Sequence, residues 1–398
     1  MAKYDVMIAG GGAVGCLLAL ALSGNGMKVA VVEAKAYDQQ ASGLRHPGFD
    51  ARSIALSHQS AAYLQQLGLT EPLLQHSTAI KRIKVTDQGH IGQCLLDHHQ
   101  QRVDALGYVI SQQELGAMLY QAVAGKVDWF CPDSISAVKT RQDGMTLALD
   151  SGSELNGSLL VVAEGGKSAT AALLGLHARV EDYAQSAVVA NVKVDRPHQN
   201  VAYERFTRQG PLALLPNQEK GFGLVWSVTT SRTQILMDCS KQHFLAQLQQ
   251  HFGYSAGRFC ELSRRSSYPL ELCTLNNAIR HRTVVIGNAA HTLHPIAGQG
   301  FNLGLRDAEC LSGLLLAQWR ARGDVGDIKV LQHYQKWRRQ DQHRVIHSTD
   351  ALVRLFSNDY WPLVGGRNLG LGLLEAFSPL RQRFANAAMG YGGQDAAC

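Results

Sequence analysis

The sequence contains no C-x-x-C pair, and none of its eight cysteines has the spacing of a zinc motif. A chain of 398 residues is long enough to bury a core without crosslinks. We therefore predict reduced thiols, as in a cytoplasmic protein, and no metal site. The adjacent His98 and His99 do not change this view, because no facial-triad or zinc spacing accompanies them on their polar stretch.

Long apolar runs and blocks of one charge are also missing. No segment reaches the roughly 20 apolar residues that cross a bilayer. The 38 basic and 32 acidic residues leave a scattered net charge of +6, which gives little support to a nucleic-acid partner. We predict a soluble protein of two or three domains, with peripheral contact at the inner membrane left open.

The composition is that of an ordinary globular protein. Hydrophobic residues make up 45% of the chain and charged residues 18%, which excludes a disordered or fibrous protein. We find no internal repeat and no low-complexity stretch.

The first forty residues have the order strand, turn, helix, strand. Residues 4–9 predict a buried strand, and a turn of the G-x-G-x-x-G pattern follows. Residues 13–24 then predict a helix and 28–32 a second strand that ends at an acid. A glycine pattern alone would be only a turn, but the complete order predicts a nucleotide-binding unit.

Each residue of this unit has a physical role. Gly10 permits the tight turn, Gly12 lets the backbone approach a pyrophosphate, and Gly15 lets the helix pack closely on the strand. The helix N-terminus offers N–H groups to phosphates. Glu33 can accept hydrogen bonds from a ribose 2′-hydroxyl but would repel a 2′-phosphate. This favours FAD or NAD over NADP at this site.

A second glycine-rich segment lies far downstream, after a strand predicted over 283–286. It contains Gly287, Asn288, Pro295, Gly298, Gly300, Asn302 and Gly304. Such a loop allows close approach of the backbone to a flat ligand. A helix is predicted from about 302 to 315, and its N-terminus could stabilise negative charge on a reduced flavin.

The sequence resembles the class A flavin-dependent aromatic hydroxylases over essentially its whole length. The landmarks are the first glycine motif, a central segment that begins at Glu164-Gly165, and the late Gly287-Asn288 segment with Pro295 and its glycines. Within that group it is most similar to the ubiquinone-biosynthesis branch. The segments that carry this narrower likeness are 46–56, 204–213, 292–304 and 366–370.

The resemblance implies FAD as cofactor and NAD(P)H as co-substrate. The residues it assigns to the cofactor are Gly10, Gly12, Gly15, Glu33, Arg52, Gln112, Glu164, Gly165, Gly287, Asn288, Pro295, Gly298, Gly300 and Asn302. The central motif usually reads Asp-Gly-x-x-Ser-x-x-Arg. Here it begins with Glu164 and lacks the final Arg, which bears on the contact with the reductant. Asn288 replaces the usual Asp, as it also does in this branch.

The resemblance further implies an α/β architecture, α+β overall. A Rossmann-like FAD-binding domain would take 1–75, 100–180 and 273–325, interleaved with an antiparallel-sheet substrate domain over 76–99 and 181–272. A helical C-terminal region would follow over 326–398. Strands read from the residues at 187–194, 212–216 and 221–229 agree with this division.

The implied reaction is hydroxylation of the ring of a polyprenylated phenol, 2-polyprenyl-6-methoxyphenol. NAD(P)H reduces FAD, the reduced flavin and O₂ form a C4a-hydroperoxide, and its distal oxygen is transferred to the ring. His294 and Pro295 are the catalytic candidates by motif position, with His291 as a further candidate base. The substrate candidates are Tyr203, Arg205, Leu212 and Leu214.

Other interpretations remain open from the sequence. A prenyl reductase on the same scaffold is one, whereas the halogenase signature Trp-x-Trp-x-Ile-Pro is absent. A non-catalytic flavin-binding subunit of a biosynthetic complex is another, because of the altered central motif. The basic stretch 337–347 predicts a solvated helix face, with docking to anionic lipid as the alternative. A ubiquinone-biosynthesis enzyme complex and a homo-oligomer are further partner hypotheses.

Overall fold

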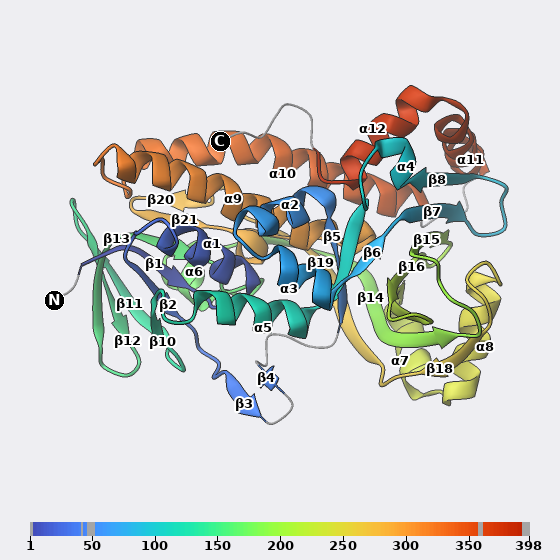
Figure 1. Cartoon of the computed structure of the whole chain (residues 1–398), viewed down its shortest axis with the longest axis horizontal. Coiled ribbons are helices and arrows are strands. Elements are labelled where there is room, and N and C mark those ends of the chain that lie inside the picture. Colours follow the sequence, from blue (N-terminus) through green and yellow to red (C-terminus); the bar gives the residue numbers. More distant parts are fainter. Residues whose placement is uncertain (1–2, 41–42, 46–51, 357–360, 392–398) are drawn as a thin grey trace.

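Two β-sheets lie side by side, and helices pack against both of them (Figure 1). This computed structural model describes residues 3–40, 43–45, 52–356 and 361–391. The predicted fold class is confirmed, because a Rossmann-like unit is combined with a largely antiparallel sheet and C-terminal helices.

The first sheet has the order β10-β2-β1-β13-β12-β11, with β21 beside β13 and β20 beside β21. Its core strands are parallel, and β11, β12 and β20 are antiparallel additions. Its strands are β1 (Lys3–Ala9), β2 (Val29–Val32), β10 (Asp128–Phe130), β11 (Ile135–Thr140), β12 (Met145–Leu149), β13 (Glu154–Val162), β20 (Ile279–Arg280) and β21 (Thr283–Val285).

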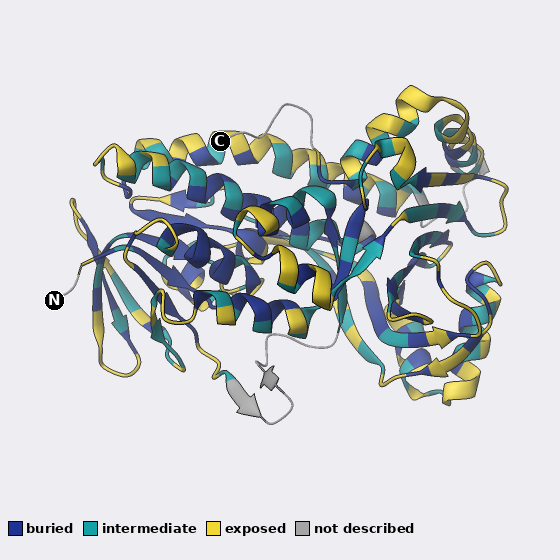
Figure 2. Cartoon of the chain, viewed as in Figure 1, coloured by how far each residue is buried: buried dark blue, intermediate teal, exposed yellow. Residues whose placement is uncertain are grey.

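Both faces of this sheet are buried, as a parallel sheet requires. Val6 and Ile8 pack toward α1 (Ala13–Ser23), α5 (Gln112–Val123) and α9 (Gln299–Arg320). Met7 and Ala9 enter a second apolar cluster on the other face. Most of α1 is buried (Figure 2), so its N-terminus is held rigidly at the carboxyl end of β1.

The second sheet has the order β22-β19-β14-β17-β16-β15-β7-β8, with β18 beside β14. Its pairs are antiparallel except β15 with β7. Its strands are β7 (Arg82–Asp87), β8 (Gln93–Asp97), β14 (Arg179–Val194), β15 (Val201–Thr207), β16 (Gly210–Asn217), β17 (Gly221–Thr229), β18 (Phe259–Leu262), β19 (Ser266–Thr274) and β22 (His291–Thr292).

One face of this sheet packs against two helices, α7 (Thr230–Asp238) and α8 (Lys241–Phe252). The opposite face meets a small sheet of order β5-β9-β6, which joins it to the first domain. The small sheet consists of β5 (Ser53–Ser57), β6 (Thr78–Ile80) and β9 (Gly107–Ser111), and β3 (Asp38–Gln40) pairs separately with β4 (Gly43–Arg45).

The strands of the two sheets alternate along the chain: β1 and β2 belong to the first sheet, β7 and β8 to the second, β10 to β13 to the first, β14 to β19 to the second, and β20 and β21 to the first again. The domain boundaries that the resemblance implies stay a prediction. The short strand β6 belongs to the small sheet, and β22 pairs with β19 of the second sheet. The remaining helices are α2 (His58–Gln66), α3 (Thr70–His76), α4 (His98–Gln101), α6 (Ala169–Leu173), α10 (Ile328–Phe356), α11 (Trp361–Ala376) and α12 (Ser378–Ala388), with 3-10 turns η1 (Gly287–Ala289) and η2 (Ile296–Gly298).

The C-terminal helices pack on the β7–β8 hairpin, at the far end of α10 (Figure 1). A buried ion pair fixes them there: Arg367 Nε lies 2.8 Å from Asp87 Oδ2, and Asn368 Nδ2 donates to the same oxygen. The segment 366–370, which resembles the ubiquinone branch, therefore anchors α11 to β7. In the part of the chain that the structure describes, no helix combines the length and the apolarity needed to cross a membrane.

Candidate functional site

The first glycine motif forms a turn between β1 and α1 in which each glycine has a different reason to be glycine. Gly10 has φ +106°, and a Cβ there would lie 2.6 Å from Ala163 O. A Cβ on Gly15 would lie 2.0 Å from Gly10 O. A Cβ on Gly12 would meet no described atom within 4 Å. Gly10 and Gly15 are thus required by the protein's own backbone, whereas Gly12 faces open space.

The N-terminus of α1 starts at this open space. Its N-cap is Gly12, no side chain of the described chain caps it, and its first turn contains no acidic residue. The first N–H groups of a helix lack partners within the helix and carry partial positive charge. This end of α1 can therefore bind phosphate oxygens.

Glu33 follows β2 and is buried against the same turn. Its Oε2 accepts a hydrogen bond from Gly11 N at 2.7 Å, and its Oε1 accepts one from Lys35 N at 2.9 Å. Each carboxylate oxygen has a second lone pair, so Glu33 can hold the turn and still accept a ribose hydroxyl.

An aromatic cluster that the sequence did not reveal lies beside this turn. The Tyr37 hydroxyl donates to Gly11 O at 2.6 Å, and the Tyr37 ring stacks on Tyr120 at 4.1 Å. Trp129 contacts both rings, and it would be 2.8 Å from a Cβ on Gly11. The three aromatics come from distant segments, and no local pattern marks them.

The second glycine segment meets the first in space, although about 270 residues separate them. A Cβ on Gly304 of α9 would lie 3.1 Å from Val14 Cγ2 and 3.2 Å from Gly287 Cα. A Cβ on Gly287 would lie 3.3 Å from Val14 Cγ1. These two positions allow α1, η1 and α9 to converge, which brings both predicted nucleotide segments to one site.

The N-terminus of α9 is also open for a ligand. It begins at Gln299 after Gly298, which has φ +63°, and no described side chain caps it. A Cβ on Gly298 would crowd Ala55 O at 3.1 Å, whereas one on Gly300 would find only ordinary contacts. The helix starts three residues earlier than the sequence predicted, so the N–H groups at Gln299 and Gly300 are those that could face a ligand.

Asn302 holds this segment in place. Its Nδ2 donates to Ala55 O at 2.9 Å and to Gly298 O at 2.8 Å, and its Oδ1 accepts from Ser57 N at 2.8 Å. The side chain predicted to contact the cofactor therefore ties β5 to the glycine loop. Asn288 is exposed in η1, and its carbonyl accepts from Thr292 Oγ1 at 3.1 Å.

Arg52 and Gln112, which are both predicted to contact the cofactor, lie together. Arg52 Nη2 donates to Gln112 Oε1 at 3.2 Å. The Arg52 guanidinium also stacks 4.2 Å from the ring centroid of Tyr268 on β19. Arg52 thereby bridges the small sheet and the second sheet, and Tyr268 is a contact that the sequence did not predict.

The central motif forms its own hydrogen bonds without the arginine that it lacks. Glu164 Oε2 accepts from Ser168 Oγ at 2.6 Å and from Thr170 N at 3.0 Å, and its Oε1 accepts from Thr170 Oγ1 at 2.6 Å. Gly165 has φ +91°, so the turn favours glycine there. Glu164 thus organises the N-terminus of α6, and its departure from Asp does not leave a broken loop.

A buried charged network supports the second glycine loop. Asp307 Oδ2 accepts from His291 Nε2 at 2.7 Å and from Gly287 N at 3.1 Å. Its Oδ1 accepts from Arg338 Nε at 2.7 Å and from Gln342 Nε2 at 3.0 Å. Burial alone would raise the pKa of Asp307, but His291 and Arg338 hold it well below its usual range. His291, a candidate base, therefore anchors β22 to α9, and Gly287 N anchors η1 to the same carboxylate.

His294 is fully buried. Its Nε2 lies 3.1 Å from Gln185 Oε1, and its Nδ1 has no partner among the described residues. Burial lowers the pKa of His294 to about 4, so the ring is neutral at pH 7. We assign the proton to Nε2 from the Gln185 contact, which leaves Nδ1 as an acceptor. Because its basicity is low, His294 suits hydrogen bonding better than proton abstraction.

This burial predicts a pH-dependent stability. Between about pH 6.5 and pH 4 the unfolded chain protonates His294 and the native chain does not, so stability falls as pH falls through this window. A shift from 6.5 to about 4 corresponds to roughly 3 kcal/mol. Urea unfolding of wild type and His294→Gln at pH 7 and pH 4 should give a shallower loss for the variant. Parallel losses in the two proteins would contradict the neutral, buried state of His294.

The four predicted substrate residues lie on the face of the second sheet that packs against α7 and α8. Leu212 and Leu214 belong to the apolar cluster with Phe244 and Leu248 of α8. Tyr203 Oη donates to Ser255 O, and Arg205 Nε donates to His251 O, both at 3.1 Å.

The alternate residues of the same strands point to the first domain instead. Ala202 and Leu215 pack with Ala55 and Val109 of the small sheet, and Val225 packs with Tyr268. Since side chains alternate along a strand, the four predicted residues and these residues lie on opposite faces of the second sheet.

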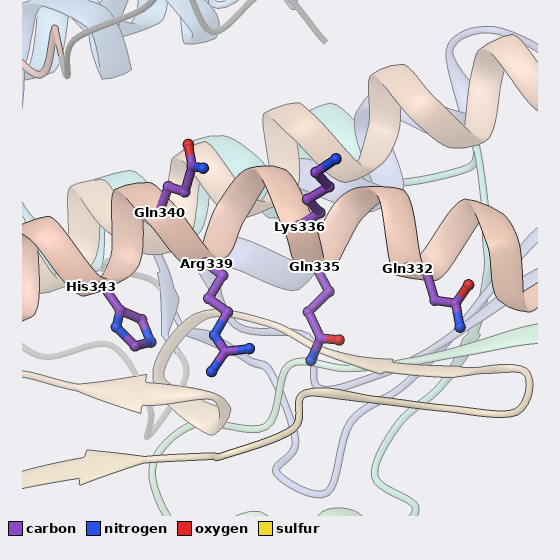
Figure 3. A pocket seen from close by; sticks show the side chains of 6 residues that line it. All are labelled: Gln332, Gln335, Lys336, Arg339, Gln340 and His343. Carbon is purple, nitrogen blue, oxygen red and sulfur yellow. The ribbon is translucent and has the colours of Figure 1, made fainter.

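Two further features lie outside this site. Asp97, His98 and His99 come within metal-ligand distance of one another, but Asp97 caps α4 by accepting from His99 N at 2.9 Å, and no second observation supports a metal. A groove of about 480 Å³ runs along α10, lined by polar and basic side chains (Figure 3). These are Gln332, Gln335, Lys336, Arg339, Gln340 and His343.

The open space at Gly12, the uncapped N-termini of α1 and α9, and the Glu33 carboxylate fit a dinucleotide such as FAD. Comparison with known families decides the assignment: the model of the FAD binding domain family matches residues 3–349. The chain belongs to this family. It is an FAD-dependent aromatic-ring monooxygenase, with FAD as cofactor and NAD(P)H as the co-substrate typical of the class.

Curated relatives match nearly the whole chain. Ubiquinone hydroxylase UbiL of Rhodospirillum rubrum is 34% identical over 393 residues, which cover 97% of this chain and 89% of the relative. The 3-demethoxyubiquinol 3-hydroxylase of Escherichia coli is 29% identical, with 97% of this chain and 98% of the relative covered. Human ubiquinone biosynthesis monooxygenase COQ6 is 27% identical, with 96% and 91% covered.

Solved structures share the fold. The p-nitrophenol 4-monooxygenase PnpA of Pseudomonas putida superposes with a TM-score of 0.79 at 18% identity, covering 99% of both chains. PqsL of Pseudomonas aeruginosa, a probable FAD-dependent monooxygenase, gives a TM-score of 0.76 at 22% identity, covering 93% of this chain and 99% of PqsL.

Proposed function

We propose that this chain hydroxylates the aromatic ring of a polyprenylated phenol, 2-polyprenyl-6-methoxyphenol, in ubiquinone biosynthesis, with NAD(P)H and O₂. The observation that carries the proposal is the relation, over almost the full length, to ubiquinone hydroxylases, including UbiL at 34% identity. The convergence of the two glycine segments at Val14 supplies the matching cofactor site. Assembly with other enzymes of the pathway, and with a second copy of the chain, stays a prediction.

The residues divide the work of holding the cofactor. The N-terminus of α1 and Gly12 would bind the pyrophosphate, and Glu33 would bind the ribose. Gly298, Gly300 and the N-terminus of α9 would face the ring system. When bound, FAD supplies the redox chemistry that takes electrons from NAD(P)H and transfers one oxygen atom of O₂ to the ring.

The substrate would lie between the glycine loop and the face of the second sheet that packs on the small sheet. Ala213, Leu215 and Val225 give this face an apolar character, which favours a phenol and excludes water from the reacting groups. Pro295 stands between the buried His294 and η2. We propose that Nδ1 of His294 accepts a hydrogen bond from a ligand bound beside the glycine loop. Gln185 and Tyr183 fix the His294 imidazole in place.

The test begins with the visible spectrum of the purified protein, which should show the bands of oxidised flavin. NADPH is then titrated anaerobically with and without a short-tail 2-prenyl-6-methoxyphenol. We expect the phenol to accelerate bleaching, and the aerobic product to gain the mass of one oxygen atom. Bound flavin that reacts with NADPH at the same rate with and without the phenol, and yields no oxygenated product, would contradict the proposal and favour the prenyl reductase or the non-catalytic subunit.

A further inference from the structure

The outer side of the C-terminal helices exposes large apolar side chains, which we call the apolar face. Leu369 and Leu373 lie on α11, Phe377 lies between the two helices and Leu380 lies on α12, while Ile91 projects from the turn between β7 and β8. Ile91 is 98% exposed and Leu369 66%. Leu369, Leu373 and Phe377 are each four residues apart, and Phe377 N still donates to Leu373 O, so these three form one stripe along α11. Leu380 belongs to α12, after the break between the two helices. The exposed outer side of these helices is visible in Figure 2.

This stripe does not pack into the core, because α11 has a separate buried side. Leu371 packs into a cluster with Val85, Ile296 and Met389. The helix has only two charged residues among 16, and one of them, Arg367, is buried against Asp87. An amphipathic surface helix would carry charges on its outer side. Here that side is apolar, which indicates contact with an apolar medium.

A groove of about 720 Å³ separates the β7–β8 turn from α11. Ile91, Val364 and Ala376 contribute its apolar side chains. Gly365 and Gly372 line it as well, and a Cβ on either would meet no described atom within 4 Å. The groove is therefore open along the helix backbone and can take an aliphatic chain.

The charges near the apolar face suit an anionic surface. Arg381 and Arg383 are the basic residues of α12, and Glu375 is the acid of α11. Glu375 Oε2 accepts a hydrogen bond from Leu95 N at 3.0 Å, and its carbonyl accepts from Arg381 Nη1 at 2.8 Å. Basic side chains beside an apolar stripe are typical of segments that lie on anionic lipid.

We propose that the apolar face rests on the phospholipid bilayer, with Ile91 and the stripe inserted among the lipids. This inference rests on the proposed function, because a polyprenylated phenol is dissolved in the bilayer. The cluster beneath α11 contains Ile296 of η2, two residues after His294. Apolar packing thus connects the docking surface directly to the glycine loop of the cofactor site.

The basic side of α10 is the competing surface, and the structure gives it less support. Arg338 is buried in the Asp307 network, so the stretch 337–347 is not a uniform basic face. The groove along α10 is lined by polar and charged side chains (Figure 3), and none of its lining residues is apolar. This side can attract anionic lipid, but the residues that line the groove include no apolar side chain to insert into the bilayer.

The test is co-sedimentation of the flavin-loaded protein with vesicles of phosphatidylethanolamine and phosphatidylglycerol. Ile91→Glu combined with Leu369→Glu should weaken vesicle binding by about tenfold or more, because two buried apolar side chains are lost. The matched control is Ile235→Glu, at a position 64% exposed on α7, which should bind as wild type does. Lys336→Gln with Arg339→Gln should reduce binding far less than the apolar pair does.

Several results would overturn the proposal. They are a wild-type protein that stays in the supernatant, a double variant that sediments as wild type does, or a loss confined to the α10 variant. A wild-type dimer that the double variant converts to a monomer, without vesicle binding, would assign the face to a second copy instead. FAD content and NADPH oxidation with a short-tail phenol should be equal in all these proteins. If the phenol stimulates none of them, the proposed function fails while the vesicle result remains readable.

Discussion

Gly12→Val is expected to abolish FAD retention while the chain keeps its fold. The new side chain would occupy the space in which no described atom lies within 4 Å of a Cβ, so it meets the cofactor's phosphates and not the protein. Gly12 already has extended backbone dihedrals that valine adopts. Loss of two hydrogen bonds to a charged phosphate corresponds to about 3 kcal/mol or more, roughly a hundredfold in affinity. Flavin absorbance per chain after gel filtration measures it.

Gly15→Val is the matched control for this prediction. Its Cβ would lie 2.0 Å from Gly10 O, so the turn itself must move. We expect the apoprotein of this variant to lose about 3 kcal/mol or more, whereas the Gly12→Val apoprotein should change by about 1 kcal/mol at an N-cap. Both are measured by urea unfolding without flavin. Wild-type flavin content in Gly12→Val would contradict the assignment of the first glycine motif.

Asp307→Ala is expected to destabilise the protein by about 3 kcal/mol, because it leaves the buried Arg338 with Asp341 as its remaining counter-charge. It also removes the acceptor for His291 and Gly287 N, so the second glycine loop loses its anchor and flavin content should fall with stability. Urea unfolding of the apoprotein at pH 7 measures the first effect, and absorbance at the flavin bands the second.

Arg354→Met provides the comparison for a surface ion pair. Arg354 contacts Asp350 and Glu181 but is largely exposed, so its removal should leave the free energy of unfolding almost unchanged. Equal losses in Asp307→Ala and Arg354→Met would show that the buried network does not support the loop. If Asp307→Ala is destabilised but keeps its full flavin content, the buried network stabilises α9 and α10 without supporting the cofactor site.

The altered central motif bears on the choice between enzyme and non-catalytic subunit. The sequence alone could not tell whether the missing Arg leaves a defective loop. In the structure Glu164 is longer than Asp and reaches Ser168 and Thr170, which satisfies the turn from within. The departure is therefore a local replacement of one set of hydrogen bonds by another. It gives no structural reason to doubt that the chain is an enzyme.

Local patterns in the sequence determined the nucleotide-binding elements. The strand predicted over 4–9, the helix over 13–24 and the strand over 28–32 match β1, α1 and β2 within one residue at each end. Their signals are short-range: an apolar run, a glycine turn and an acid at a strand end act on neighbouring residues. The apolar runs over 212–216 and 221–229 likewise predicted β16 and β17 without any tertiary information.

Only the tertiary structure decided which side of a strand packs on α8 and which distant residues come together. Alternation along β15 and β16 gives two faces, and which of them packs on α8 depends on where that helix lies. The contacts of Asp307 with Arg338, of Arg52 with Tyr268 and of Gly304 with Gly287 likewise join residues far apart or on different elements. No spacing rule encodes such contacts, because they follow from how whole elements pack and not from the order of residues along the chain.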